Sequence, residues 1–432
     1  MVISANARQT CALLLTAALG AAIGLSSCKL LTPVPQDAAL EMSERARVAS
    51  AKHPLTSGNE VVLQDGATTR EAMLDSIERA RDHIHLLTYR LEDDRTGERL
   101  ADALIRQSRR GLAVHVICDG VGSSGTSRAL LLRFSQAGVK VLAFNPVDMA
   151  GAEAGGDRET GGRSHRKLLI IDGHTAFSGG ISISSLSSGG SFSQASHTRP
   201  GADHAGRDTD LQVRGPAVAE FQRIFMTTWG LHGGPPFPPR TYFPELHAVG
   251  NDMVRAIGSG PQEGPSVIYL TLLAAIASAD TRIRLTNTHF VPDPVLVDAL
   301  EDAADRGVDV ALVLPGRGDS WLVLSAGRAQ YERLLRAGVK IHERRGEVRH
   351  SKTVLIDGEW AVVGSTNLDW RSSLQNHELD TVVMGAGFGA RLAALFDHDL
   401  ANADEIRLEA WDRRPAHQRM REALALAWAY WL

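Results

Sequence analysis

Short apolar runs alternate with helical stretches of about a dozen residues along most of the chain. The apolar runs at 84–89 and 283–288 each follow a segment with helical spacing, 69–81 in one case and 270–279 in the other. Strands that alternate with helices of this length are typical of α/β layers with a largely parallel sheet. The pattern therefore predicts the α/β class, with α/β/α sandwiches built on mixed, mostly parallel sheets.

The same pattern occurs twice, which indicates a duplicated unit. The tetrapeptide Ala-Gly-Val-Lys stands at 137–140 and again, letter for letter, at 337–340. Internal self-similarity of this kind is the signature of repeated architecture. The Pro-rich stretch 233–244 separates the two copies. It follows a helix with aromatic residues at four-residue spacing, which we interpret as core packing: Phe221, Phe225 and Trp229.

Composition and charge exclude two broad classes of protein. The chain has 432 residues, 44% of them hydrophobic and 22% charged, with a formal net charge of −4. These are globular values, and they argue against disorder and against a polybasic nucleic-acid coat. Any phosphate chemistry must therefore rest on local groups of cationic residues.

The N-terminus has the pattern of an export signal. Arg8 precedes an apolar run at 11–25, which is too short to span a membrane well, and the string Leu-Ser-Ser-Cys ends at Cys28. This string resembles the lipobox of bacterial lipoproteins, in which the Cys becomes the lipidated first residue of the mature protein. The resemblance implies a bacterial cell-envelope protein, lipid-anchored and facing the periplasm, and Lys29 favours the outer membrane. An uncleaved anchor or an ordinary signal peptide is the alternative.

These patterns divide the chain into six predicted segments. Beyond the signal, Cys118 lies in an apolar run and is expected to be a buried strand residue. The segments are a signal peptide at 1–27, an N-terminal linker at 28–54, a first α/β domain at 55–232, a Pro/Gly-rich linker at 233–251, a second α/β domain at 252–403 and a C-terminal amphipathic tail at 404–432.

Each repeat contains a His-x-Lys pair at the start of an apolar strand. The first reads His165-Arg166-Lys167 and the second His350-Ser351-Lys352. Residues two apart in a strand project to the same face, so each strand presents an imidazole beside an ammonium group. Two such pairs brought face to face would suit a phosphoryl centre.

Both motif strands end in Asp-Gly, at Asp172 and Asp357. These aspartates have the opposite parity to the histidines, and Asp-Gly between two apolar strands is a hairpin signal, so we interpret them as structural. The return strands end in small residues that allow close approach to a ligand, and Gly180 and Ser365 are candidate substrate contacts. Asn367 follows in the second copy.

With these residues in place, the sequence resembles the phospholipase D superfamily. Its mark is a pair of HxKx4D motifs, each followed after six residues by a Gly-[Ser/Gly]-x-Asn string. The resemblance covers about 61–399 and is nearest to the cardiolipin synthase branch, as seen at 59–66, 364–372 and 413–415.

The resemblance implies tandem domains with one active site at their pseudo-two-fold interface, without a metal or cofactor. In the family, one His attacks phosphorus to form a phosphohistidine and the other is the general acid and base. His165 is assigned as the nucleophile and His350 as the acid/base, and the reverse assignment stays open. Lys167, Lys352 and Asn367 are implied to hold the phosphate oxygens. The aspartates of the motifs belong to the same catalytic signature.

Two acids occupy places that resemble the family's orienting carboxylates: Asp208 and Glu378. Simple salt-bridge roles are the alternative. Ser182 stands where the first copy would have its Asn, so it is a weaker candidate for the substrate contact. His289 either lines the mouth of the pocket or is structural.

The expected activity is a cardiolipin synthase-like phosphatidyl transfer between membrane phospholipids. A phospholipase D that hydrolyses phospholipids to phosphatidic acid is the nearest alternative. A nuclease of the same superfamily is another, although no nucleic-acid partner is expected, and a lipid-binding scaffold is the non-enzymatic one. The oligomeric state stays open. A C-terminal apolar stripe either meets lipid or packs on the domain: Met420, Leu424, Trp428, Trp431 and Leu432.

Overall fold

The computed structural model describes residues 52–146, 162–180, 208–261, 266–318, 320–346 and 350–428. Several predictions lie outside these residues and stay predictions. They are the signal peptide at 1–27, the lipidated Cys28, nearly all of the 28–54 linker, the substrate contact Ser182 and the last two members of the C-terminal stripe, Trp431 and Leu432.

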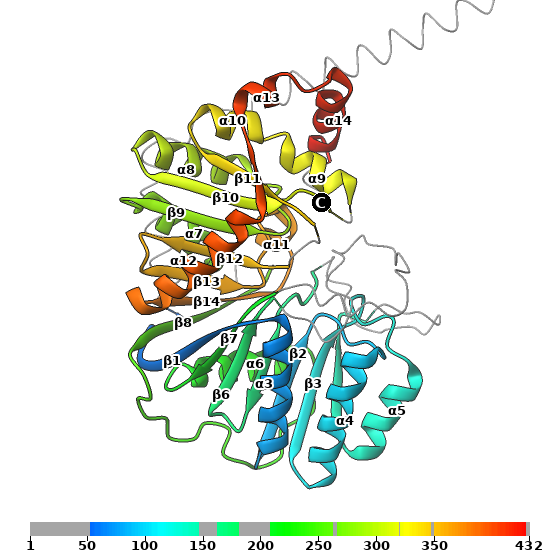
Figure 1. Cartoon of the computed structure of the whole chain (residues 1–432). Helices are drawn as coiled ribbons and strands as arrows, with labels where there is room; N and C mark the ends of the chain where they lie inside the picture. Colours follow the sequence, from blue (N-terminus) through cyan, green and yellow to red (C-terminus); the bar gives the residue numbers. More distant parts are fainter. Residues whose placement is uncertain are drawn as a thin grey trace, which may run out of the picture. The chain divides into compact units, whose positions relative to one another are not determined.

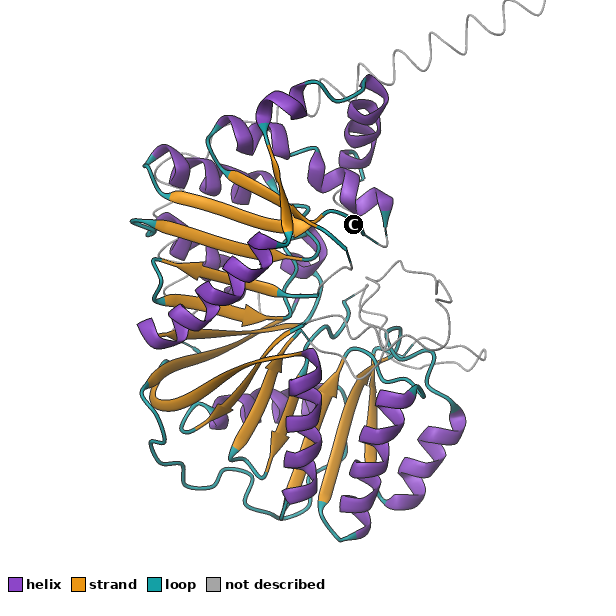
Figure 2. Ribbon diagram, in the orientation of Figure 1, coloured by secondary structure: helices purple, strands orange, loops and turns teal. Residues whose placement is uncertain are grey.

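Fifteen strands of the described residues form one continuous sheet (Figures 1 and 2). Their order is β15-β11-β10-β9-β12-β13-β14-β8-β1-β7-β6-β5-β2-β3-β4. Read outward from the β8–β1 pair, the order of one half repeats the other, which confirms the duplicated unit. The strands are β1 (Thr56–Asp65), β2 (His83–Thr88), β3 (Ala113–Asp119), β4 (Lys140–Phe144), β5 (Leu168–Ile171), β6 (Thr175–Gly179), β7 (Thr209–Arg214), β8 (Asp252–Ser259), β9 (Arg282–Asn287), β10 (Asp309–Pro315), β11 (Lys340–Arg344), β12 (Lys352–Ile356), β13 (Trp360–Gly364), β14 (Glu378–Met384) and β15 (Ala403–Ile406).

The sheet is mixed, as predicted, but it is not mostly parallel. Among the described strands, parallel pairs occur only within β2–β3–β4 and β9–β10–β11. The remaining pairs are antiparallel. The motif strands fold back as the hairpins β5–β6 and β12–β13, and β7 and β14 then pair antiparallel with β6 and β13. The alternating pattern predicted the parallel strands of each half, and the Asp-Gly signals at Asp172 and Asp357 predicted the two hairpins.

Helices cover both faces of the sheet (Figure 2). Phe221, Phe225 and Trp229 of α6 are buried in a core that also holds residues of the second half, which confirms core packing for this helix. The helices are α3 (Gly66–Arg79), α4 (Arg95–Arg109), α5 (Arg128–Ala137), α6 (Val218–Leu231), α7 (Val267–Ala277), α8 (Pro294–Asp305), α9 (Trp321–Arg328), α10 (Tyr331–Arg336), α11 (Trp370–Leu374), α12 (Ala386–Ala401), α13 (Leu408–Asp412) and α14 (Ala416–Leu426).

The two halves share one sheet and one hydrophobic core. The antiparallel pair β1–β8 joins them, with Thr56 opposite Val254. One hydrophobic core contains Leu211 from the first half and Leu379 and Phe388 from the second. Because apolar surface is buried between the copies, we expect neither copy to be stable alone.

The C-terminal segment belongs to the second half. The predicted boundary between 403 and 404 falls inside β15, which pairs with β11. Trp411 of α13 is buried in the core of the second half, and α14 packs on α9 through Ala425 and Ala326. None of the helices in the described ranges has the length and apolar character that a membrane crossing requires.

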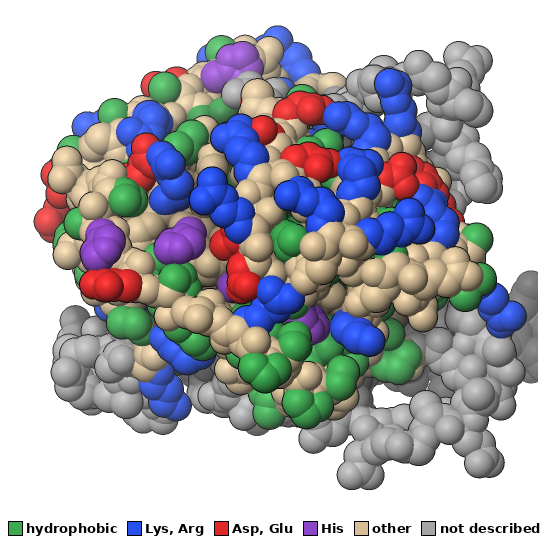
Figure 3. All heavy atoms as spheres, turned by 90° about the horizontal axis from the view of Figure 1, so that it is seen from below, with side chains coloured by type: hydrophobic (Ala, Val, Ile, Leu, Met, Phe, Trp, Pro, Cys, Tyr) green, Lys and Arg blue, Asp and Glu red, His purple; other side chains and the backbone are tan. Residues whose placement is uncertain are grey.

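Charges of both signs are mixed on the face shown in Figure 3, where Lys and Arg side chains stand among Asp and Glu. On the first half, ion pairs link neighbouring helices, for example Arg99 with Glu71 at 2.9 Å between α4 and α3. Exposed pairs of this kind contribute little stability each.

Candidate active site

The two motif histidines face each other where the halves meet. His165 precedes β5 and His350 precedes β12, and their ring centroids lie 5.8 Å apart with the ring planes at 84°. The backbone N–H of His165 donates to the carbonyl of His377 at 2.9 Å, which fixes the first motif against the second half. The structure therefore brings together the two His-x-Lys pairs that the sequence singles out.

His165 is held by residues of the opposite half. Its Nδ1 lies 3.1 Å from a carboxylate oxygen of Glu378 and 2.9 Å from the carbonyl oxygen of Ser365. Glu378 is fully buried at the start of β14. A buried carboxylate beside a ring nitrogen is the arrangement that orients a catalytic imidazole.

His350 is held in the mirrored way by residues of the first half. Its Nδ1 donates to the carbonyl oxygen of Gly180 at 3.0 Å, and a carboxylate oxygen of Asp208 lies 3.7 Å from it, an ion-pair distance. Each orienting acid therefore serves the histidine of the other copy. The site requires both halves together.

These contacts determine the tautomer of both rings. A carbonyl oxygen can only accept a hydrogen bond, so Nδ1 of His165 and Nδ1 of His350 carry the proton. In the neutral ring Nε2 then has a free lone pair. One such nitrogen can attack phosphorus, and the other can take up and return a proton.

Burial keeps both rings neutral. It holds the pKa of His165 well below the ordinary value, and the positive charges of Lys167 and Lys352 lower it further. Burial also lowers the pKa of His350 to about 3, and Lys352 adds to the effect. A bound phosphodiester anion would oppose these influences and raise both pKa values.

The two lysines bend back toward their own motifs. Lys167 Nζ donates to the carbonyl oxygen of His165 at 2.7 Å, and Lys352 Nζ donates to that of His350 at 2.8 Å. Burial lowers the pKa of Lys167 to about 8 and that of Lys352 to about 7, against the pull of the nearby carboxylates. An incoming phosphate would favour their charged forms.

The two orienting acids differ in charge. Burial raises the pKa of Glu378 to about 7, despite the nearby Lys167. Burial also pushes the pKa of Asp208 upward, but His350 and the two lysines outweigh it, so the pKa of Asp208 is lowered. At neutral pH Asp208 is therefore ionised, whereas Glu378 is partly protonated.

A serine and a second acid support Glu378, and sequence reasoning missed both roles. The hydroxyl of Ser365 donates to Glu378 at 2.5 Å and accepts from the backbone N–H of Leu379, so this residue positions the acid. Asp380 accepts from the backbone N–H groups of Ser365 and Thr366. The matching Asp-x-Asp and Glu-x-Asp strings at 208–210 and 378–380 are the signal that could have found it.

Arg166 was also missed, although it lies inside the first motif. Its guanidinium is buried and donates to the carbonyl oxygens of Glu378 and Ser259 and to the hydroxyl of Thr228, at 2.8–3.0 Å. It fixes the backbone of the acid that orients His165. The sequence offers no counterpart, because the second motif has Ser351 at this position.

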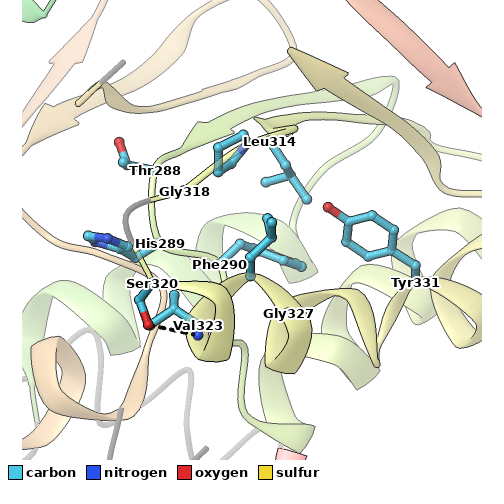
Figure 4. A pocket seen from close by; sticks show the side chains of 11 residues that line it. Thr288, His289, Phe290, Leu314, Gly318, Ser320, Val323, Gly327 and Tyr331 are labelled. Carbon is cyan, nitrogen blue, oxygen red and sulfur yellow. Dashed lines mark hydrogen bonds between the residues drawn. The ribbon is translucent and has the colours of Figure 1, made fainter. Parts of the chain in front are cut away.

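Gly180 and Asn367 lie at the ends of the two return strands. A Cβ atom at Gly180 would stand 2.1 Å from a carboxylate oxygen of Asp208, so the first half requires glycine here. Asn367 is buried beside His289, whose pKa is lowered to about 3 by burial and by the positive Lys352, while contact with Asn367 opposes the shift. His289 therefore belongs to the site and lines the adjoining pocket (Figure 4).

The two motif aspartates lie at the turn ends of β5 and β12, away from the histidines. Asp172 accepts the backbone N–H groups of residues 81, 82 and 83 at 2.8–3.0 Å. Asp357 accepts those of 280, 281 and 282 at 2.7–2.9 Å. Both have positive φ in their hairpin turns. Their place in the catalytic signature is therefore structural, since each ties a hairpin to the start of a neighbouring strand.

No group of three or more His, Cys, Asp or Glu residues is arranged to hold a metal ion in the part of the chain that the structure describes. Cys118 on β3 is buried and not in a disulfide, as expected of a core strand residue. Burial raises the pKa of its thiol to about 11.

Comparison with known proteins gives consistent matches. The family model described as "Cardiolipin synthase, PLD-like domain" matches residues 73–190 and 272–400. A cardiolipin synthase of Geobacillus sp. (strain WCH70) is 33% identical over 385 residues, covering 87% of this chain and 72% of that protein. One of Alkalihalophilus pseudofirmus is 32% identical over 383 residues, covering 86% and 72%.

A solved structure shares the fold of both halves. The crystal structure of phosphatidylserine synthase from Haemophilus influenzae Rd KW20 covers 90% of this chain and all of that chain, with a TM-score of 0.65 and 13% sequence identity. At this identity the likeness concerns the fold alone. It agrees with two copies of an α/β unit in one chain.

Proposed function

The chain belongs to the cardiolipin synthase family of the phospholipase D superfamily, and from this we propose that it is a phosphatidyltransferase that acts on membrane phospholipids through a phosphohistidine. The observation that supports the proposal is that the two histidines face each other and that each is held by residues of the opposite half. Each ring is fixed through Nδ1 by the opposite half, and their centroids are 5.8 Å apart. We infer that the phosphorus atom of the substrate binds between the two rings.

In the first step, Nε2 of His165 attacks the phosphorus of the donor lipid. The bond between phosphorus and the oxygen of the head-group alcohol breaks as the P–N bond forms, and His350, protonated at Nε2, gives its proton to the departing oxygen. The charge of Asp208 at 3.7 Å favours the imidazolium form of His350 that this step needs. The products are a phosphatidyl-histidine and the free alcohol.

In the second step, His350 takes the proton from the hydroxyl of an acceptor lipid. The acceptor oxygen attacks phosphorus, the P–N bond breaks, and His165 is restored. Positive charge from Lys167 and Lys352, with the amide of Asn367, would hold the non-bridging oxygens as negative charge grows on them. With water as acceptor the same steps give phosphatidic acid.

We also propose that the protein is tethered to a membrane through a lipid on Cys28. The support is the Leu-Ser-Ser-Cys string at 25–28, and the relatives named cardiolipin synthases fit a membrane substrate. A periplasmic position rests on the same string, and an outer-membrane position rests on Lys29. Mass spectrometry of the intact protein purified from a bacterial host would show the added lipid, and a Cys28→Ser variant would lack it.

The test of the activity is lipid mass spectrometry after incubation of the protein with phosphatidylglycerol liposomes, with and without phosphatidylethanolamine, in the presence of a chelator. Cardiolipin with released glycerol or ethanolamine is the expected result, and the alcohol identifies the donor. Phosphatidic acid alone would make the protein a phospholipase D. No change in the lipids would contradict the proposal and direct the search to nucleic-acid phosphodiesters.

A further inference from the structure

An apolar stripe remains exposed on α14 although the helix is docked. The opposite side of the helix is buried: Ala425 packs with Ala326 of α9, and the buried Glu422 pairs with Arg414 at 2.9 Å. Yet Met420, Leu424 and Trp428 are 63%, 62% and 59% exposed. The two readings of this segment, packing on the domain and meeting lipid, therefore apply to opposite faces of one helix.

A second exposed tryptophan extends the stripe onto α9. Trp321, the first residue of α9, is 56% exposed, and the guanidinium of Arg421 lies over its ring at 4.9 Å. Large apolar side chains gathered on two adjoining helices are unusual on a surface that meets only water. Together these residues form what we call the α9–α14 face, made of Trp321, Met420, Leu424 and Trp428.

Positive charge accompanies the α9–α14 face. Three arginines of the segment are exposed, Arg413, Arg419 and Arg421, whereas Arg414 is half-buried and pairs with the buried Glu422, in a chain whose formal net charge is −4. If two copies met through this face about a two-fold axis, the arginines of one would oppose those of the other. An anionic surface complements it instead. Exposed tryptophans ringed by arginine are typical of segments that lie at a membrane interface.

The face adjoins the pocket that His289 lines. The pocket has an empty volume of about 430 Å³, which includes open solvent, and it is lined by Thr288 and His289 after β9 and by Ser320, Val323 and Leu324 of the α9 region (Figure 4). Trp321 follows Ser320 directly. The end of β9 that leads into this pocket, Asn287, pairs with Lys352 of the second motif.

We propose that the α9–α14 face is a docking surface for the anionic face of a phospholipid bilayer, and that it holds the pocket mouth against the lipid. The proposal rests on the proposed function, since it states how a membrane phospholipid reaches this site. A substrate molecule would then leave the bilayer beside α9 and pass His289 on the way to the histidines. The face acts whether or not a lipid on Cys28 tethers the chain.

The direct test places a nitroxide on the face and measures its accessibility to oxygen and to a water-soluble nickel chelate. The full chain carries Leu424→Cys in a background in which Cys11 and Cys28 are serine, and it is mixed with phosphatidylglycerol vesicles. Val249→Cys is the matched control, because Val249 is 55% exposed and precedes β8, at the end of the sheet away from the histidines. We expect the label at 424 to move into lipid and the label at 249 to stay in water.

Two results would overturn the proposal. One is a label at 424 that stays as accessible to the nickel chelate as the label at 249. The other is a label at 424 that is already protected without vesicles, which would mean that a second copy covers the face. Phosphatidylcholine vesicles should protect the label at 424 from the nickel chelate less than phosphatidylglycerol vesicles do. Added salt should make the difference between the two kinds of vesicle smaller.

Kinetics separate this proposal from the proposed function. In the triple variant Met420→Ser/Leu424→Ser/Trp428→Ser, we expect transfer on phosphatidylglycerol vesicles to fall at least tenfold and transfer on monomeric dihexanoylphosphatidylglycerol to stay within twofold of the parent. The control variant Val249→Ser/Phe243→Ser should lose neither. Equal activity of the triple variant on vesicles would contradict docking. A parent protein that transforms neither lipid, with the 424 label in the bilayer, would contradict the proposed function alone.

Discussion

The two halves of the molecule share a strand order and a motif, yet they support their histidines differently. The histidine of the first half is held by Glu378 at 3.1 Å, and that of the second half by Asp208 at 3.7 Å. The pKa of Glu378 is raised to about 7 by burial, whereas that of Asp208 is lowered because His350 and the two lysines outweigh the same effect of burial. Duplication preserved the geometry and allowed the charge to diverge.

We propose that this difference underlies the two chemical roles. An ionised Asp208 stabilises a positive ring, which the general acid needs, and so favours His350 in that role. A partly protonated partner such as Glu378 carries less negative charge and draws a proton onto the ring of His165 less strongly, which suits a nucleophile. The electrostatics of the site therefore support His165 as nucleophile and His350 as acid/base.

The largest expected effect comes from removing either histidine. We expect His165→Ala and His350→Ala each to lower kcat on phosphatidylglycerol by about 10³-fold or more, since nucleophile and general acid act as one unit. Lipid mass spectrometry with matched unfolding midpoints is the measurement. Retention of more than a tenth of the parent's kcat by either variant would break the account of a shared site.

Neutralising the two orienting acids should lower kcat by different factors. We expect Asp208→Asn to cost about 10²-fold in kcat and Glu378→Gln about tenfold, because the first removes a charge that the reaction uses and the second replaces a partly neutral group. Each amide keeps the shape of the acid that it replaces, so the two variants are matched controls for each other. Equal losses, or the reverse order, would show that the charge difference does not matter to the reaction.

The sequence predicted the residues of the site but not that each acid contacts the histidine of the other half. The repeat, the two His-x-Lys pairs and both acids follow from spacing along the chain, because local period and turn chemistry determine them. Which half each acid serves depends on the pairing that places β14 and β7 on either side of the β8–β1 pair, and pairing between distant strands leaves no local signal. Gly180 and Ser365 were expected to face substrate, and only the structure shows their carbonyls holding the two rings.

The halves also differ on the far side of the sheet. In the first half the rings of His85 and His115 lie 5.2 Å apart, buried against Trp229 and neighbouring aromatic rings. The corresponding positions of β9 and β10 in the second half are Arg284 and Ala311. This buried histidine pair should add an acid sensitivity to the first half that β9 and β10 of the second half lack.

Acid should therefore destabilise the protein through these histidines. The pKa of His115 is lowered to about 4 by burial and by the positive charges of His83, Lys140 and Arg240, and that of His85 is also well below its ordinary value. The unfolded chain binds these protons first, so stability falls as pH drops from 6.5 toward 4, by up to about 3 kcal/mol for His115. Urea unfolding across this range should show His115→Phe less acid-sensitive than Arg284→Gln.

A smaller effect is expected at the hairpin turns. Loss of the backbone contacts in Asp357→Ala or Asp172→Ala should lower the free energy of unfolding by about 1–2 kcal/mol while kcat is kept. Backbone N–H groups outweigh burial and lower the pKa of Asp357 to about 2, so its contribution is present above pH 4 and is lost as pH falls toward 2. A loss of kcat of more than tenfold in a folded variant would contradict the structural role and show that these aspartates take part in catalysis.

The most direct test of the division of roles is a rapid-quench experiment with a phosphatidyl donor whose leaving group is p-nitrophenol, which departs without a general acid. His350→Ala should then release a burst of about one equivalent of p-nitrophenol and accumulate a phosphatidyl group on His165, because attack is intact while activation of the acceptor is lost. His165→Ala should give no burst. A burst from His165→Ala and none from His350→Ala would contradict the assignment.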